Sequence, residues 1–433
     1  MAKFAIPQSA TCLVEVSESK LDLRSEAEIL EELHSFRPVT SERNVWAFWD
    51  KGIDVMYPSY HHTVINWVRK LGPEWTVRVL DVVEGSPNNV YKFLDEAWFP
   101  ECFLNKTMDG SHASQHTANL VRLPLLVEYG GVWMDVGNIL HTHLDQLFWD
   151  RMTAPGSPYE LSLWITSGVI TKRWGCFPNF IIASRKGCAF IRNWHNCYKE
   201  LWKGKTNCIG FHKHPLIQDI GLADGSVVFG DPQHNLYSME DVSDYGAHML
   251  IGERISNLLD VATGWNGREF FETKALLSEG IRGSSLGALV SGVFDGQREA
   301  EFFTTPLDEV DEEKRHAAES FIVQMLEDAY ICKVFHNPLA DPVVGPLAFG
   351  DLIKREEFRD ADHRPGTFGE MYRFGTVHWR SEREVEYLTP QPAEIEIIRA
   401  TVTASSQKSN PQNVEGKCLD GRHDSGVSMA MVK

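Results

Sequence analysis

Over the first ninety residues of the chain, segments with the apolar pattern of a strand alternate with a segment that has the apolar pattern of a helix. The β-branched and aromatic run Val45–Trp49 is typical of a buried strand and ends at a turn signal, Asp50-Lys51-Gly52. Residues 58–71 repeat apolar side chains at helical spacing, and residues 75–81 alternate as a second strand. Because two strands separated by a helix usually run parallel, this pattern predicts an open α/β sheet. Ligands of such sheets bind outside the carboxyl ends of the strands.

A second helix and strand bring an acid to that edge. A helical stripe runs over residues 114–128, and Tyr129-Gly130-Gly131 ends it. Val132-Trp133-Met134 follows as a short buried strand, and Asp135 leaves this strand at its carboxyl end. The helix also carries Arg122, whose guanidinium is suited either to binding a phosphate or to holding Asp135.

The rest of the chain divides by its patterns into a lead-in at residues 1–43, the sheet-containing core at 44–240, a mainly helical region at 241–403 and a tail at 404–433. Further patterns predict a strand at 180–183 and helices at 188–202, near 255–261 and at 312–330. The tail is rich in Ser, Asn, Gln and Gly without apolar periodicity, which predicts disorder. We therefore expect an α/β core with a more helical C-terminal lobe.

Charge and composition narrow the possible partners. The formal net charge of −18 argues against a nucleic-acid or anionic membrane surface, since phosphates repel a chain without a concentrated basic stripe. A phosphate-bearing substrate then needs local Arg or Lys residues or a bound cation. No apolar run approaches the roughly 20 residues that cross a bilayer, and no secretory signal is visible, so we expect a cytoplasmic protein without a membrane span. The eight cysteines form no C-x-x-C pair and are interpreted as free thiols.

These blocks are similar in order to those of a known family. Residues 45–49, 66–70, 75–81, 116–122 and 129–135 resemble the capsular polysaccharide synthesis family, which is related to glycosyltransferases with a sugar-binding D-x-D motif. The resemblance covers less than half of the chain, and its most specific part is the Y-G-G-x-W-x-D block with an upstream Arg. It implies a GT-A fold, an open, mostly parallel sheet flanked by helices. It also implies retaining transfer of a hexose from a UDP- or GDP-sugar to a hydroxyl of a glycan, lipid or small metabolite. Residues 241–403, beyond the resemblance, are expected to contribute to the acceptor side.

Single residues take roles from the resemblance. Asp135 matches the motif acid, expected to be catalytic and to hold Mn²⁺ or Mg²⁺, since a hard cation offsets the charge of the departing diphosphate. Nucleotide-sugar binding is expected of Trp46, Phe48, Trp49, His116, Asn119, Arg122, Gly130 and Gly131. Asn138 and Asp219 are candidates for the polar group near the reacting carbon, and Trp133, His212 and His214 for contacts with the acceptor or around the site.

Two departures from the family pattern remove negative charge. Gly137 stands where relatives often carry a second acid, and Asn119 stands where the family commonly has Asp. Both changes weaken the expected affinity for a metal ion. An alternative is therefore a degenerate or repurposed GT-A-like protein that binds a nucleotide or small metabolite without transfer.

Other patterns leave further alternatives open. His141, His143 and Asp145 share one face if they form a strand, either as metal ligands or as ordinary surface residues. His336 and His378-Trp379 are C-terminal candidates for the site. Four tryptophans line an acceptor groove or pack in the core: Trp164, Trp174, Trp194 and Trp202. The sequence has no G-x-S-x-G elbow and no G-x-x-x-x-G-K-[ST] loop, which argues against an α/β hydrolase or a P-loop kinase.

Overall fold

The computed structural model describes residues 4–165, 177–222, 238–292, 295–336, 347–388 and 398–399. Residues 1–399 form one compact unit around a seven-stranded sheet. The strand order is β13 (Tyr387–Leu388), β10 (Ala275–Glu279), β6 (Leu161–Ile165), β7 (Ile181–Ser184), β4 (Gly131–Met134), β2 (Asn44–Phe48) and β3 (Thr76–Leu80). Five strands run in one direction, whereas β7 and β13 oppose them. The predicted open, mostly parallel sheet is thereby confirmed.

Smaller ladders accompany this sheet. They pair β1 (Leu13–Glu15) with β12 (Trp379–Ser381), β5 (Asn138–Leu140) with β11 (Ile331–Lys333), and β8 (Leu258–Asp260) with β9 (Trp265–Asn266) and β14 (Ile398–Arg399). The pairing of β5 with β11 matters for function, because β5 begins three residues after Asp135.

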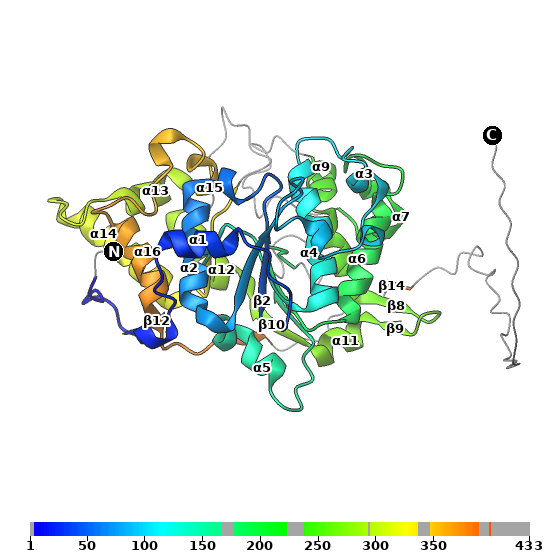
Figure 1. The fold of residues 1–433 in the computed structure, drawn as a ribbon, viewed down its shortest axis with the longest axis horizontal. Coiled ribbons are helices and arrows are strands. Elements are labelled where there is room, and N and C mark those ends of the chain that lie inside the picture. Colours follow the sequence, from blue (N-terminus) through cyan, green and yellow to red (C-terminus); the bar gives the residue numbers. More distant parts are fainter. Residues whose placement is uncertain are drawn as a thin grey trace, which may run out of the picture. The chain divides into compact units, whose positions relative to one another are not determined.

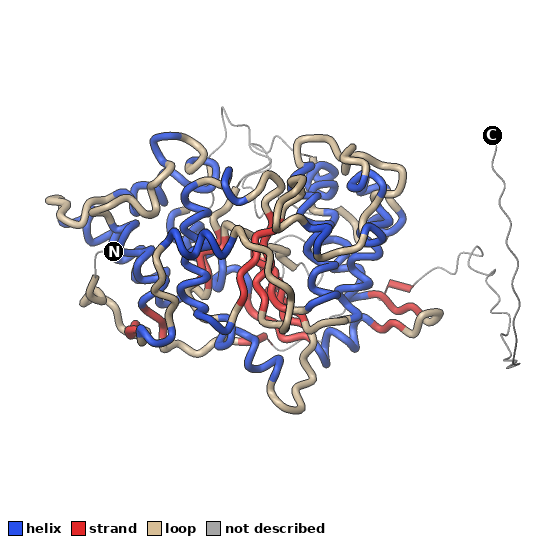
Figure 2. The backbone as a smooth tube through the Cα atoms, viewed as in Figure 1, coloured by secondary structure: helices blue, strands red, loops and turns tan. Residues whose placement is uncertain are grey.

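Helices cover both faces of the central sheet. They are α1 (Glu26–Leu33), α2 (Pro58–Leu71), α3 (Glu101–Leu104), α4 (Ala113–Tyr129), α5 (Asp150–Thr153), α6 (Ala189–Leu201), α7 (Pro215–Gln218), α9 (Met239–Tyr245), α10 (Ala247–Asn257), α11 (Gly267–Lys274), α12 (Gly280–Ser291), α13 (Gly296–Thr304), α14 (Glu312–Asp328), α15 (Phe349–Leu352) and α16 (Phe368–His378). In Figure 1, α1, α2, α12, α14 and α16 lie on one side of the strands, and α4, α6, α9 and α11 lie on the other. Figure 2 shows the strands gathered between these two groups.

The alternation along each strand explains this layered arrangement. In β2, Val45 and Ala47 pack with the α2 and α14 side, while Trp46 and Phe48 pack with the α4 and α6 side. Both faces of the strand are apolar because both are covered by helices, as is usual for parallel strands. The unbroken apolar character of Val45–Trp49 in the sequence therefore has a direct structural cause.

Most predicted elements are present with shifted ends. The helix predicted at residues 58–71 has those bounds as α2, and the helix predicted at 312–330 is α14. The helix predicted near 255–261 is wrong in its second half, because α10 ends at Asn257 and the next residues pair with β9 as β8. Strand β10, from the C-terminal part of the chain, joins the central sheet beside β6.

Three further predictions concern the domain boundaries, the C-terminal tail and membrane spans. The boundaries at residues 43 and 240 stay predictions, and the tail at 404–433 lies outside the described residues. Within the part of the chain that the structure describes, no helix is long and apolar enough to cross a bilayer.

Candidate active site

A cavity of about 430 Å³ lies at the carboxyl ends of β2 and β4. Aromatic residues from the end of β2 and from α2 line it together with residues of α4, the junction of α9 and α10, and the segment after β11. Its volume falls in the range of about 300–1,000 Å³ that is usual for small-molecule sites. The edge of the sheet where ligands were expected is therefore hollowed.

Asp135 stands at this cavity because strand β4 ends one residue before it. Its backbone N–H donates to the carbonyl of Phe180 at 2.9 Å, and its own carbonyl accepts the N–H of Asn138 at 2.9 Å. This turn holds the backbone, while the Asp135 side chain remains 28% exposed. The acid predicted from the sequence is thus neither sealed in the core nor free in solvent.

The Asp135 carboxylate is surrounded by N–H groups and cations. Oδ1 accepts the indole N–H of Trp133 at 2.9 Å and lies 3.5 Å from the Arg122 guanidinium, and Oδ2 lies 3.1 Å from the Lys333 ammonium. Burial raises the pKa of Asp135, but Lys333, Arg122 and the hydrogen bonds outweigh it, so the pKa lies below its usual range. Asp135 is therefore ionised at neutral pH.

Arg122 holds Asp135 from the α4 side. Its side chain is 4% exposed, its guanidinium donates to the carbonyl of Asn179, and it stacks 4.8 Å from the centre of the Trp133 ring. Burial lowers the pKa of Arg122, and Asp135 opposes that shift. Of the two roles considered for this residue, the geometry shows the contact with the acid, and Arg122 also lines the cavity.

Gly130 and Gly131 shape the other end of β4. Their φ angles are +67° and +99°, and a Cβ on Gly131 would lie 2.5 Å from the carbonyl oxygen of Asn44. Only glycine permits this backbone so close to a neighbouring strand. Neither glycine lines the cavity. The pair lets β4 enter the sheet beside β2, and Asp135 emerges at the opposite end.

The structure brings part of the predicted set together. The residues predicted around the Y-G-G-x-W-x-D block and the first strand that line the cavity are Phe48, Trp49, Asn119, Arg122, Trp133 and Asp135. Asn119 accepts a hydrogen bond from the Asn179 side chain at 3.2 Å. It therefore helps to hold the segment to which Arg122 donates.

Other predicted residues lie away from the cavity. Trp46 is fully buried and donates its indole N–H to Gly130, and Asn138 is fully buried beneath the turn, with its amide on the Phe180 carbonyl. His116 bonds the Tyr198 hydroxyl, and burial lowers its pKa to about 3. His212 pairs with Asp244, and His214 caps the first turn of α7. Asp219 is 62% exposed and faces Arg254. None of these residues lines the cavity.

Only two members of the alternative metal set meet, since His143 Nδ1 lies 3.6 Å from an Asp145 carboxylate oxygen. Strand β5 ends at Leu140, and His141 turns into the core, where its ring nitrogens face the Ala329 carbonyl and the Tyr372 hydroxyl. Asp145 pairs with Arg43 at 2.6 Å. Among the described residues, no group of three His, Cys, Asp or Glu side chains is arranged to hold a metal ion.

The tryptophan alternatives are partly resolved by burial. Trp164, Trp194 and Trp202 are each at most 1% exposed, so they pack in the core. Trp174 lies outside the described residues.

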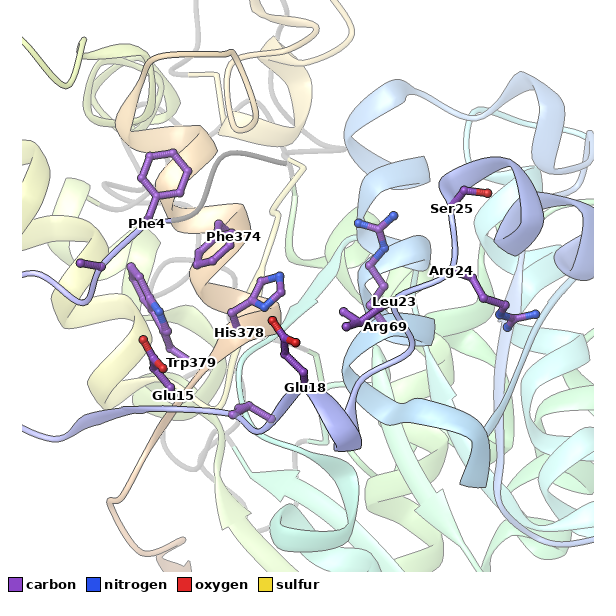
Figure 3. A pocket seen from close by; sticks show the side chains of 12 residues that line it. Phe4, Glu15, Glu18, Leu23, Arg24, Ser25, Arg69, Phe374, His378 and Trp379 are labelled. Carbon is purple, nitrogen blue, oxygen red and sulfur yellow. The ribbon is translucent and has the colours of Figure 1, made fainter.

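The two C-terminal candidates are at different places. His336 lines the cavity beside Asp135, with its ring nitrogens on Asp351 at 3.2 Å and on the Tyr60 hydroxyl. Burial lowers the pKa of His336, so its ring is neutral at pH 7. In contrast, His378 and Trp379 line a separate cavity of about 630 Å³ near the N-terminal segment (Figure 3).

Sequence reasoning missed several residues of the cavity. Lys333, Tyr60, Tyr245, Asp351 and Lys354 all line it, and none was singled out. Lys333 lies 198 positions from Asp135 in the chain, yet their side chains are in contact. Strand pairing between β5 and β11 creates this contact, and no local motif announces it.

An ionised acid lies at the end of a central strand of this open, mostly parallel sheet, beside a cavity with aromatic and cationic walls. Residues 15–227 match the family described as capsular polysaccharide synthesis protein. The chain belongs to this family, and it is a glycosyltransferase.

Relatives over nearly the whole chain support that assignment. The chain is 37% identical to the O-glycosyltransferase braB of Annulohypoxylon truncatum, covering 89% of this chain and 92% of the relative. It is 35% identical to the glycosyltransferase afumC of Aspergillus fumigatus, covering 88% and 96%. The solved PaToxG glycosyltransferase is similar at 15% identity over 52% of this chain and 92% of that chain, with a TM-score of 0.27, too low to add to the argument. The relationship favours an enzyme over a non-catalytic binding protein.

Proposed function

We propose that the enzyme transfers a hexose from a UDP- or GDP-sugar, bound in the 430 Å³ cavity, to a hydroxyl group of an acceptor. The observation that carries this proposal is the ionised Asp135 beside Arg122 and Lys333 at the open end of the sheet. Breaking the bond between the sugar and the diphosphate places additional negative charge on the departing phosphate. Fixed cations beside that position stabilise this charge more than they stabilise the bound substrate.

The aromatic wall suits the rest of the donor or the acceptor. Trp49 lies with its ring centre 6.1 Å from that of Tyr57 and 5.6 Å from that of Tyr60, and all three line the cavity. Such rings bind the flat face of a base or the apolar face of a sugar while their polar atoms hold hydroxyl groups. The relative braB is named an O-glycosyltransferase, which agrees with a hydroxyl acceptor.

Acceptor activation is assigned to His336. Its neutral ring donates one N–H to Asp351 and accepts the Tyr60 hydroxyl at the other nitrogen, so the pair is suited to pass the acceptor's proton to the Tyr60 oxygen while the Tyr60 proton moves to His336. The acceptor oxygen then forms the new bond to the sugar as the diphosphate leaves with the electron pair of the old bond. Retention of configuration stays a prediction, and proton NMR of the initial product anomer decides it.

The test is a donor screen with matched variants. Purified enzyme is incubated with UDP-glucose, UDP-galactose and GDP-mannose, with and without Mn²⁺, and release of UDP or GDP is measured. Asp135→Asn keeps the shape of the side chain but removes its charge, and we expect loss of about 10²–10³ in kcat. Asp150→Asn, at a side chain that is 69% exposed on α5, should retain wild-type rates. Wild-type turnover by Asp135→Asn would discard the assignment.

A further inference from the structure

Both carboxylate oxygens of Asp135 already have partners in the protein. Oδ1 faces Trp133 at 2.9 Å and Arg122 at 3.5 Å, and Oδ2 faces the Lys333 ammonium at 3.1 Å. A divalent ion on either oxygen would lie beside two fixed cations, and like charges at this range repel strongly. Mn²⁺ and Mg²⁺ prefer several oxygen ligands. One carboxylate with two resident cations does not fit the predicted metal ion.

Lys333 lies beside the position from which the second acid of a D-x-D pattern would project. A Cβ built on Gly137 would be 3.7 Å from the Lys333 Nζ. The other acids of the cavity are also engaged, since Asp50 accepts the Ser114 hydroxyl at 2.8 Å and Asp351 pairs with Lys354 at 2.9 Å. An ammonium group therefore lies close to the position where the second carboxylate of a D-x-D pattern would be.

The fold holds this ammonium rigidly. Lys333 ends β11, pairs in register with Asn138 of β5, and is followed by Val334, whose N–H donates to the Gly137 carbonyl at 2.8 Å. Its side chain is 13% exposed, and Nζ lies 5.2 Å from the centre of the Phe180 ring. A cation fixed before the reaction needs little reorganisation when charge develops, which is the condition for strong electrostatic catalysis.

The charge of the cavity differs in sign from that of the chain. The whole chain carries a formal net charge of −18, but four cations and three acids line the cavity: Lys51, Arg122, Lys333 and Lys354 against Asp50, Asp135 and Asp351. With the histidines neutral, the wall has a surplus of one positive charge. An anionic diphosphate therefore meets a local excess of positive charge in this cavity.

We infer that Lys333, positioned by Asp135 and assisted by Arg122, supplies the positive charge that a divalent ion supplies in D-x-D enzymes, so that transfer needs no metal. This inference rests on the proposed function. The bond from the anomeric carbon to the phosphate oxygen breaks, and its electron pair goes to the nucleoside diphosphate, whose added charge the ammonium stabilises. The acceptor oxygen forms the new bond, and its proton passes by way of Tyr60 to His336. Donor and acceptor are the only reactants.

The first arm of the test uses the full-length wild-type enzyme. After removal of metals with EDTA and a chelating resin, release of UDP or GDP from the best donor of the screen should stay within about threefold of the rate with Mn²⁺ added. Calorimetry should show UDP or GDP binding with the same affinity with and without Mn²⁺, and EPR titration should show no site for one Mn²⁺ ion. An inactive chelated enzyme that Mn²⁺ restores, or a stoichiometric Mn²⁺ site lost in Asp135→Asn, overturns the inference.

The second arm removes the ammonium. Lys333→Met should lower kcat by about 10²–10³ and weaken binding of UDP or GDP, whereas Lys333→Arg should recover part of both. Lys203→Met, at a side chain that is 78% exposed, is the control for loss of a lysine. Circular dichroism checks that the variants are folded. Wild-type kcat in a folded Lys333→Met enzyme rejects the role of Lys333. If no donor is cleaved by wild-type enzyme even with Mn²⁺, the proposed function itself fails.

Discussion

The contact between Arg122 and Asp135 is open to a direct energetic test. The perturbation is a double-mutant cycle with Arg122→Met, Asp135→Asn and the double variant. At 3.5 Å and an effective dielectric constant of about 20, Coulomb's law gives roughly 5 kcal/mol of gross attraction. Because Asp135 is 28% exposed and also faces Lys333, we expect a net coupling of about 1–3 kcal/mol.

The two single variants should differ in how much their free energy of unfolding falls. Arg122→Met removes the ion pair, the hydrogen bond to Asn179 and the stacking on Trp133, so its free energy of unfolding should fall by about 3–5 kcal/mol. The free energy of unfolding should fall less in Asp135→Asn, because the Trp133 N–H retains an oxygen acceptor. The double variant should lose less than the sum of the two.

The assay is urea unfolding of all four proteins at pH 7, followed by circular dichroism. The pKa of Asp135 is lowered in the folded state, so its contribution to stability is present above the unfolded value of about 3.9 and is lost as pH falls through the folded pKa. A cycle on Arg364 and Asp360, whose side chains are 38% and 43% exposed, is the control and should couple by about 0.3–0.5 kcal/mol. Additivity within about 0.5 kcal/mol at Arg122 and Asp135 would refute the argument.

Two further predictions concern stability. Burial raises the pKa of Glu299 to about 8, so the folded state keeps a proton that the unfolded state loses, and this group should lower the free energy of unfolding by about 1.4 kcal/mol per pH unit between pH 5 and 8. Glu299→Gln should flatten that slope in urea titrations at several pH values, and an unchanged slope contradicts the prediction. Gly131→Ala should lower the free energy of unfolding by more than about 3 kcal/mol, because its Cβ would lie 2.5 Å from the Asn44 carbonyl oxygen in the middle of the sheet. Gly187→Ala, with similar positive φ but open space, should cost only about 1–3 kcal/mol, and equal losses in thermal melts would refute the steric argument.

Local periodicity was sufficient for much of the fold. The apolar run that became β2 and the helical spacing that became α2 are short-range patterns, and each has a single solution once both faces must be buried. Asp135 was found for the same reason, since a polar residue directly after a buried strand must emerge at the carboxyl end. The family resemblance, and not periodicity, supplied four further residues that line the same cavity: Phe48 and Trp49 at the end of β2, and Asn119 and Arg122 in the middle of α4.

Other predicted residues failed to reach the cavity because periodicity does not reveal which side of an element faces it. Trp46 and His116 lie on elements that border the site, yet both side chains point into the packing between the sheet and its helices. Gly130 and Gly131 were in the right motif but at the far end of the strand. The role of Gly130 and Gly131 is to adopt the positive φ angles with which β4 begins.

The charge environment of Asp135 was decided only by tertiary structure. Lys333 reaches it through the pairing of β11 with β5. Tyr60 reaches the same cavity from α2, and Asp351 reaches it from α15. Contacts between positions hundreds of residues apart depend on how strands and helices choose their neighbours. The sequence therefore determined the acid and the sheet edge that carries it, whereas packing determined which cations face that acid, because electrostatic interactions depend on distance in space and not on distance along the chain.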